Sequence, residues 1–136
     1  YIDRLLQQEN ISNRLKRHLF YPGYIHNADL ATLYNAAFAF LYPSLRESFG
    51  IPLVEAMACG TPVITGNTSS MPEIGGPDIL AADPCRPEEI AGAVLRLENE
   101  DALYRQQREY GLLRAQQFSW KKTADELIQV YQSLDI

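Results

Sequence analysis

Residues 43–60 read PSLRESFGIPLVEAMACG, and this stretch decides how the chain folds. It follows an apolar run at residues 37–42, which predicts a buried central strand of a parallel sheet. Pro52 suits the first turn of a helix and Gly60 suits its end, so the stretch predicts a loop that leads into a helix over residues 53–59. In open α/β sheets, ligands bind at such loops, where unpaired backbone N–H groups favour an anion such as a phosphate.

Short apolar runs alternate with helical patterns along the chain, which predicts an α/β fold with a Rossmann-like parallel sheet and flanking helices. Strands are predicted at residues 18–21, 37–42, 63–65 and 79–81. Further helices are predicted at residues 29–35, 87–98, 101–117 and 119–134, with turns at residues 66–77. Asp29 and Ser119 are the expected N-caps of two of these helices, and Phe118 and Trp120 are expected to anchor the last one.

Length and composition exclude several classes of protein. A chain of 136 residues with 46% hydrophobic and 21% charged residues is typical of one globular domain. The net charge is −5 and the cations are dispersed, so nucleic acid is not an expected partner. No apolar run reaches the roughly 20 residues that span a bilayer. Cys59 and Cys85 lack metal or disulfide spacing, which predicts reduced thiols and a cytoplasmic protein, and a start at Tyr1 indicates a piece of a longer chain.

Two carboxylates flank the predicted anion site. Glu47 precedes the loop and Glu55 lies in the following helix, eight residues later. Because two carboxylates beside a phosphate would repel it, they are better suited to accept hydrogen bonds from neutral hydroxyl groups on either side. A ligand that carries hydroxyl groups on both sides of its phosphates is a nucleotide sugar. The competing interpretation makes Glu55 a helix-dipole partner and Glu47 a solvated loop residue. The expected backbone donors are Phe49, Gly50, Ile51 and Leu53, since Pro52 has no N–H.

These residues resemble the E-x7-E motif of retaining glycosyltransferases of family 4, which have the two-domain GT-B architecture. The resemblance covers nearly the whole chain in the same order. The other residues that carry it are Gly23, Tyr24, Asp29, Leu30, Leu33, Tyr34, Pro43, Ser44, Phe49, Gly50, Ala56, Met57, Ala58, Gly60, Pro62, Val63, Ile64, Ser69, Ser70, Pro72, Glu73, Phe118, Ser119 and Trp120. The resemblance implies that residues 1–136 are part of the C-terminal, nucleotide-sugar-binding half, without its first two strands.

The resemblance also implies roles for individual residues. Glu47, as the catalytic residue, would hold hydroxyls of the donor sugar, and Glu55 would accept from the ribose hydroxyls. The residues expected to cradle the sugar and diphosphate are Ser48, Phe49, Gly50, Ile51 and Leu53, those expected to border the base are Gly23, Tyr24 and Ile25, and those expected nearby are Ser69, Ser70 and Glu73. The full-length enzyme would transfer a hexosyl-type glycosyl group from a nucleoside diphosphate sugar to a hydroxyl acceptor, with retention and with neither metal nor cofactor.

The family also uses an Arg and Lys pair on the diphosphate, from a segment that would precede Tyr1. Between residues 20 and 84 the only Lys or Arg is Arg46. We therefore expect the 136-residue chain alone to be inactive and to bind the donor weakly. The N-terminal, acceptor-binding domain is an expected partner, and peripheral membrane contact through that half fits a role in polysaccharide synthesis.

Two other kinds of function remain open. One is a noncatalytic nucleotide-binding or interaction module of the same fold. The other is a nucleotide-sugar epimerase or a phosphorylase of the same architecture. The sequence has no D-x-D pair, and His18 and His26 are isolated, so no metal site is expected. It does not specify the base, the sugar or the acceptor.

Overall fold

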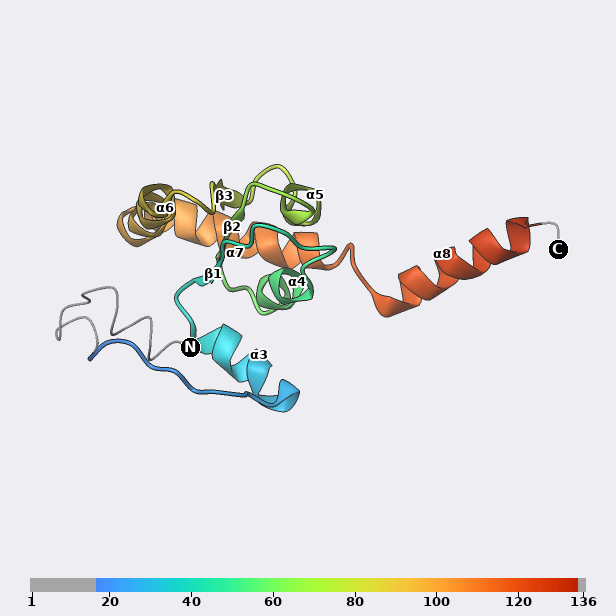
Figure 1. Cartoon of the computed structure of the whole chain (residues 1–136), viewed down its shortest axis with the longest axis horizontal. Helices are drawn as coiled ribbons and strands as arrows, with labels where there is room; N and C mark the ends of the chain where they lie inside the picture. The colour runs from blue at the N-terminus through green and yellow to red at the C-terminus, as the bar shows by residue number, and fades with distance from the viewer. Residues whose placement is uncertain (1–16, 135–136) are drawn as a thin grey trace.

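The central strand of the sheet is β2 (Val63–Gly66), whose residues are all buried. It lies between β1 (Phe40–Tyr42) and β3 (Leu80–Ala82), and both neighbours run parallel to it. The computed structural model describes residues 17–134, drawn as the coloured ribbon in Figure 1. The predicted α/β class with a parallel sheet and flanking helices is confirmed.

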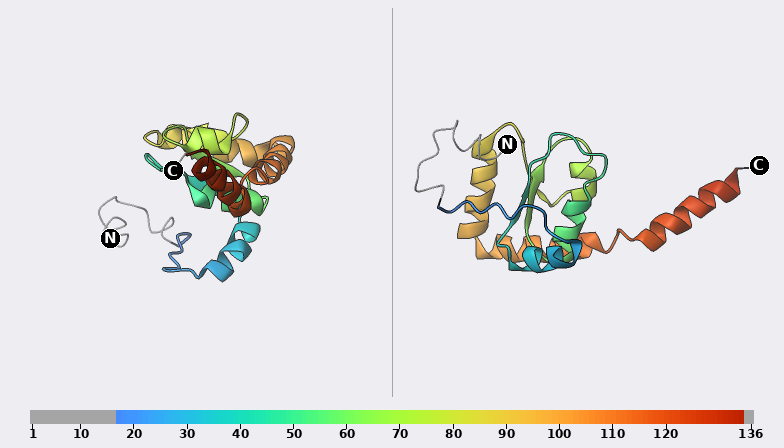
Figure 2. Two further views of the ribbon diagram at one scale, coloured as in Figure 1. Left: turned by 90° about the vertical axis from the view of Figure 1, so that its right-hand side faces the viewer. Right: turned by 60° about the horizontal axis from the view of Figure 1, so that its bottom comes forward.

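Helices cover both faces of this sheet (Figure 2). The helices of the described chain are α3 (Asn27–Ala36), α4 (Ile51–Ala58), α5 (Met71–Gly75), α6 (Pro87–Asn99), α7 (Asp101–Ala115) and α8 (Trp120–Ser133). On one face α6 packs against β2 and β3, and on the other α4 and α5 pack against β2. The helix α7 contacts both α4 and α6, so it ties the two layers together.

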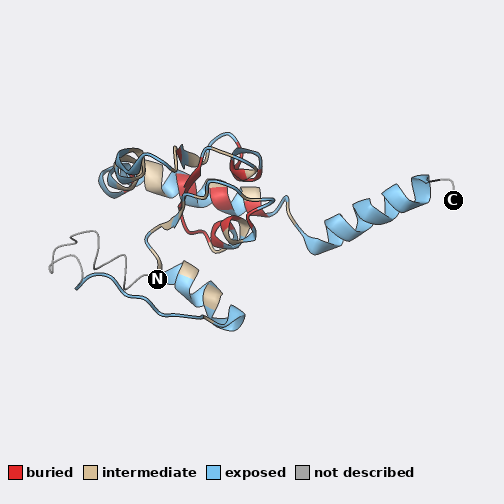
Figure 3. Cartoon of the chain, in the orientation of Figure 1, coloured by how far each residue is buried: buried red, intermediate tan, exposed pale blue. Residues whose placement is uncertain are grey.

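The core lies between β2, α4 and α5, where the buried residues are concentrated (Figure 3). Leu53, Ala56 and Met57 are fully buried and recur along α4 at the spacing of one helix face. They form one cluster with Val63 of β2 and Met71 of α5. Burial of this face fixes the helix, and with it the loop before it, against the sheet.

Polar residues of α7 satisfy the free carbonyl groups at the end of α5. Gln107 donates from Nε2 to the carbonyl of Asp78 at 2.8 Å, and Tyr110 Oη donates to the carbonyl of Gly75 at 2.9 Å. Arg114 donates to two further carbonyls within α5. A five-residue helix has few hydrogen bonds of its own, so these contacts hold α5 in place beneath the loops that precede it.

The last helix, α8, extends away from the rest of the molecule (Figure 1). Ser119 is its N-cap, as predicted, and Ser119 Oγ accepts from the backbone N–H of Lys122 at 3.1 Å. Phe118 is half-buried against the core, whereas Trp120 is 80% exposed. The prediction that both aromatic residues anchor α8 is therefore right for Phe118 and wrong for Trp120.

Two strand predictions need correction. Residues 17–18 form a turn and residues 19–23 have no regular structure, so the strand predicted at residues 18–21 is wrong. The strand predicted at residues 37–42 is shorter, and β1 is the edge of the sheet within the described chain rather than a central strand. Leu41 is half exposed, and its side chain lies on the face of the sheet toward α6. Residues 18–21 pair with none of the three strands.

Helix boundaries also differ from the prediction at three points. α3 begins at Asn27 after His26, so Asp29 lies in the first turn and is not the cap. α4 begins at Ile51, two residues earlier than predicted, because Gly50 turns the chain directly into the helix. Residues 66–77 are not all turns, since they include α5. The other elements end within two residues of their predicted bounds.

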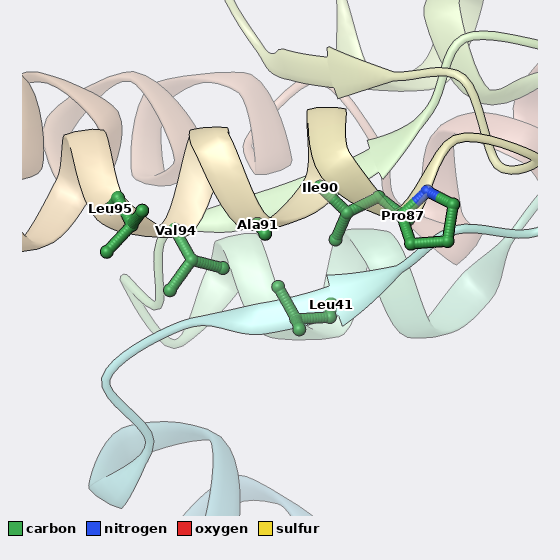
Figure 4. A pocket seen from close by; sticks show the side chains of 6 residues that line it. All are labelled: Leu41, Pro87, Ile90, Ala91, Val94 and Leu95. Atoms are coloured by element: carbon green, nitrogen blue, oxygen red, sulfur yellow. The ribbon is translucent and has the colours of Figure 1, made fainter. Parts of the chain in front are cut away.

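An apolar groove of about 480 Å³ lies between β1 and α6 (Figure 4). Leu41 of β1 forms one side, and Pro87, Ile90, Val94 and Leu95 of α6 line the other. The groove lies beside the strand that forms the edge of the sheet in the described chain. No helix in the described part of the chain is long and apolar enough to cross a membrane.

The turn from β1 into α4 depends on Gly50. Its backbone is in the left-handed region, with φ 92° and ψ 55°, where a side chain is strained. A Cβ at this position would also collide with the Met71 side chain, which is fully buried. Only glycine can therefore connect this loop to the helix without strain.

We expect Leu97→Ala to lower the free energy of unfolding by about 2–5 kcal/mol, because Leu97 is the buried residue of α6 at 1% exposure. Leu95→Ala, on the same helix at 55% exposure, is the matched control, with an expected change within about 0.5 kcal/mol. Denaturant unfolding of the full-length protein measures both. Equal losses in the two variants would contradict the packing of α6 described above.

We expect Gly50→Ala to destabilise the protein by about 1–3 kcal/mol through backbone strain and the contact with Met71. Gly92→Ala is the control, because a Cβ there meets nothing within 4 Å and Gly92 lies inside α6. That control is expected to be neutral or stabilising by up to about 1 kcal/mol. A Gly50→Ala variant as stable as Gly92→Ala would show that the turn tolerates a side chain.

Candidate functional site

The carboxylate of Glu47 is held by two hydroxyl groups from its own loop and strand. Tyr42 Oη donates to Glu47 Oε1 at 2.7 Å, and Ser44 Oγ donates to the same oxygen at 3.1 Å. Tyr42 is the last residue of β1, so the side chain of Glu47 turns back toward the carboxyl end of that strand. Glu47 is half-buried, not the freely solvated loop residue of the competing interpretation.

The main chain of Glu47 is fixed by the loop that follows β2. Its backbone N–H donates to Ser69 Oγ at 3.1 Å, and its carbonyl accepts from Ser69 Oγ at 2.6 Å and from Ser70 Oγ at 3.1 Å. Thr68 Oγ1 also donates to the carbonyl of Ser44 at 3.3 Å. The two loops after β1 and β2 are thus joined side chain to main chain, and Glu47 is held at both its backbone and its carboxylate.

Ser69 and Ser70 were expected near the site, and they do lie there. Their hydroxyl groups bond to the loop itself, so their contribution is to hold Glu47 in place. Ser69 has φ 58°, the left-handed region that few residues other than glycine adopt. Glu73 lies in the first turn of α5 with its carboxylate exposed, and its carbonyl accepts from Arg114.

The loop enters α4 at its N-terminus, where backbone N–H groups are free. Within residues 17–134, no hydrogen bond uses the N–H of Phe49, Gly50 or Ile51. Leu53 differs from the prediction, because its N–H donates to the carbonyl of Gly50 at 3.0 Å and its side chain is fully buried. Ser48 is exposed beside these groups. The anion site expected here therefore has three free donors from the predicted set, and Leu53 supports it from the core.

Glu55 lies on the exposed side of α4, one turn after Ile51. Tyr34 Oη donates to Glu55 Oε2 at 3.3 Å. Both residues line a groove of about 290 Å³ between α3 and α4, together with Asn27, Leu30, Ala31, Ala58 and Cys59. The carboxylate thus opens onto a hollow along the C-terminal half of α4.

Both tyrosines keep their phenolic protons over a wide pH range. Burial raises the pKa of Tyr42 to about 12, and the hydrogen bond to Glu47 and its negative charge add to this effect. Burial, then the charge of Glu55 and the hydrogen bond to it, likewise raises the pKa of Tyr34 to about 12. At neutral pH each phenol is therefore a hydrogen-bond donor to its glutamate.

The segment expected to border a base precedes α3. Gly23 has φ 72°, Tyr24 is 82% exposed, and Ile25 is half-buried. The ring of Tyr24 meets that of His26 edge-on, with centroids 5.3 Å apart. The segment leads into α3, whose first turns line the groove beside Glu55. Its role toward a ligand stays a prediction.

An aromatic contact links the loop to the far end of α7. Phe49 meets Phe118 edge-on at 5.7 Å between ring centroids, and the guanidinium of Arg114 lies 5.2 Å from the Phe118 ring. Arg114 is occupied by carbonyl groups of α5, and Arg46 is exposed on the loop. In the described part of the chain, no cluster of three or more His, Cys, Asp or Glu side chains could hold a metal.

Sequence reasoning missed the hydroxyl groups that orient the two glutamates. Tyr42 was assigned to a predicted strand, Tyr34 to a predicted helix and Thr68 to a turn, with no hydrogen-bonding role for any of them. A signal for these hydroxyl groups was present in the sequence, because Tyr42 ends a strand and Tyr34 lies in the last turn of a helix. Buried tyrosine hydroxyls need a hydrogen-bond partner, and the nearby glutamates provide it.

A family model described as "Glycosyl transferases group 1" matches residues 4–114. The chain is 40% identical over 114 residues to "O-antigen chain mannosyltransferase B" of Escherichia coli. The matched residues are 84% of this chain and 30% of that protein. The chain therefore spans about a third or less of the length of this curated relative.

Two solved structures have the same fold. Sucrose-phosphate synthase from Thermosynechococcus elongatus superposes with a TM-score of 0.83 at 32% identity, covering 98% of this chain and 33% of that one. Anabaena HepE, solved in complex with UDP-glucose, superposes with a TM-score of 0.82 at 19% identity. The superposition covers 98% of this chain and 36% of HepE. The predicted C-terminal half of a GT-B fold is confirmed. The chain belongs to the group 1 glycosyltransferases.

Proposed function

We propose that the loop after β1 and the N-terminus of α4 bind a nucleoside diphosphate sugar. The full-length protein would transfer a hexosyl group from that donor to a hydroxyl acceptor, with the anomeric configuration retained. The observation that carries this proposal is the fixed carboxylate of Glu47 in the loop that also supplies the free N–H groups of Phe49, Gly50 and Ile51. A carboxylate held in this way is ready to accept from sugar hydroxyls without first being ordered.

The diphosphate would lie against the N–H groups of Phe49, Gly50 and Ile51. These groups carry the positive end of the α4 dipole, and they stabilise negative charge that builds up on a departing phosphate. Glu47 would accept from hydroxyls of the glycosyl unit and steady its positive character as the bond breaks. A front-face departure of the diphosphate fits this arrangement, because the donors and the carboxylate belong to one loop.

The nucleoside would extend toward the groove between α3 and α4. Glu55 is exposed there and has one oxygen hydrogen-bonded to Tyr34, so the other remains for the ribose hydroxyls. Gly23, Tyr24 and Ile25 lead into this groove and would border the base. Anabaena HepE, which shares the fold, is known in complex with UDP-glucose, and this supports a nucleotide sugar as the ligand class.

The negative charge of the loop and its surroundings supports a role for other parts of the full-length protein in binding the diphosphate. The carboxylates of Glu47, Glu55 and Glu73 surround the loop, and Arg46 is the one cation between residues 20 and 84. A diphosphate in this field needs cations from elsewhere, which the family resemblance assigns to an earlier strand–loop–helix. We therefore propose an N-terminal acceptor domain as partner, no metal, and no activity for the 136-residue chain alone.

The cellular setting follows from the same proposal. Cys59 and Cys85 are both free thiols, which supports a cytoplasmic site of action. The similarity to an O-antigen mannosyltransferase supports a role in polysaccharide synthesis. Peripheral contact with a membrane would then involve the part of the protein that binds the acceptor.

We expect the full-length protein to bind one class of donor among UDP-glucose, GDP-mannose and ADP-glucose, as measured by ligand-observed NMR. Glu55→Ala should weaken binding of that donor by about tenfold or more, because a charged hydrogen-bond acceptor for the ribose is lost. Glu109→Ala is the matched control, since this glutamate is exposed on α7 and should leave binding unchanged.

Binding that survives Glu55→Ala would locate the nucleoside away from this groove. Absence of binding to all three donors would contradict the proposal. A protein that binds the donor but transfers nothing to any hydroxyl acceptor would instead be a noncatalytic nucleotide-binding module.

A further inference from the structure

The two oxygens of the Glu47 carboxylate have different environments. Oε1 accepts from both Tyr42 Oη, at 2.7 Å, and Ser44 Oγ, at 3.1 Å. Within residues 17–134, no hydrogen-bond donor reaches Oε2. A carboxylate oxygen has about two lone-pair sites, so Oε1 is saturated by the protein and Oε2 remains for a ligand.

Tyr42 is held more rigidly than a loop residue would be. Its ring stacks on that of Phe40, with centroids 5.5 Å apart and planes at 20°. Its carbonyl accepts from Thr65 Oγ1 at 3.3 Å, which fixes the end of β1 to the central strand. The ring also packs against the core cluster beneath α4. The hydroxyl group is therefore in a defined position before any ligand arrives.

We propose that Tyr42 is a positioning residue that, with Ser44, holds Oε1 of Glu47 so that Oε2 is presented to the glycosyl unit of the donor. The inference rests on the proposed function, since it describes how the same site recognises the sugar part of its proposed ligand. In the described chain the Tyr42 hydroxyl donates to Glu47 and not to Glu55, so we expect its removal to act on the sugar side of the ligand.

This arrangement separates the two ends of the ligand. Tyr42 pairs with Glu47 at the sugar end, and Tyr34 pairs with Glu55 at the nucleoside end, through a longer contact of 3.3 Å. Loss of the Tyr42 hydroxyl would free Glu47 to rotate, which costs affinity only for a ligand that carries a sugar. A purely structural role for Tyr42 would weaken nucleotide and nucleotide sugar alike.

The test compares two affinities of the full-length protein, one for a nucleoside diphosphate and one for the corresponding nucleoside diphosphate sugar. The probe pairs are UDP and UDP-glucose, GDP and GDP-mannose, and ADP and ADP-glucose. For Tyr42→Phe we expect about a tenfold loss of affinity for the sugar nucleotide. Binding of the free nucleoside diphosphate should stay within about twofold. Ser44→Ala should give the same pattern with a smaller loss, because its hydrogen bond is longer.

The matched control is Tyr104→Phe. Tyr104 stacks on Phe38 at 5.0 Å and its hydroxyl makes no hydrogen bond within residues 17–134, so its removal should change neither affinity. Equal losses for nucleotide and nucleotide sugar in Tyr42→Phe, or no loss in either, would overturn the inference. If Tyr42→Phe does not fold, the same two affinities in Ser44→Ala decide the question.

The experiment also separates this inference from the proposed function. Wild-type protein that binds none of the sugar nucleotides overturns the proposed function, and the role of Tyr42 with it. Wild-type protein that binds one of them, with Tyr42→Phe indistinguishable from it, overturns the role of Tyr42 alone. A loss restricted to the sugar nucleotide supports both.

Discussion

The left-handed turn at Gly50 is the constraint on which the site depends. It allows the chain to leave the loop after β1 and begin α4 at once, over the buried Met71 side chain. Because Leu53 of the same turn is buried in the core, the N-terminus of α4 has a fixed place at the carboxyl end of the sheet. Glu47 precedes this turn by three residues, so its position follows from that of the helix.

Rigidity at the site is supplied by the adjacent strand β1 and by two elements that are distant in sequence. Ser69 and Ser70, in the loop after β2, donate hydrogen bonds to the carbonyl of Glu47. Tyr42 of β1 donates a hydrogen bond to the Glu47 carboxylate. The helix α7 supports α5, and hence Met71, through hydrogen bonds to carbonyl groups. Preorganised donors and acceptors of this kind need no reordering when a ligand binds, which favours both affinity and catalysis.

Local patterns in the sequence predicted much of the fold. The sequence predicted a strand at residues 63–65, where β2 lies, a helix at residues 87–98, where α6 lies, and Ser119 as the cap of α8. Errors occurred where partners distant in sequence decide the structure. Residues 18–21 have a strand-like composition but pair with no strand, and Trp120 is apolar but lies at the start of a helix that extends away from the body.

The candidate site shows the same division. Glu47, Glu55 and the glycine between them could be chosen from spacing and residue chemistry, because a motif is a local property of the chain. The tyrosine partner of Glu55 could not, since Tyr34 and Glu55 come together only when α3 packs against α4. The engaged N–H of Leu53 was missed for a simpler reason, because the helix begins two residues earlier than its composition suggests.

A crystal structure of the full-length protein with a nucleoside diphosphate sugar would test the central claim most directly. We expect the diphosphate within hydrogen-bond distance of the Gly50 and Ile51 N–H groups, the glycosyl hydroxyls on Oε2 of Glu47, and the ribose hydroxyls on Glu55. A donor bound with its diphosphate away from the N-terminus of α4, and with neither glutamate in contact with a hydroxyl group, would contradict the assignment of this site.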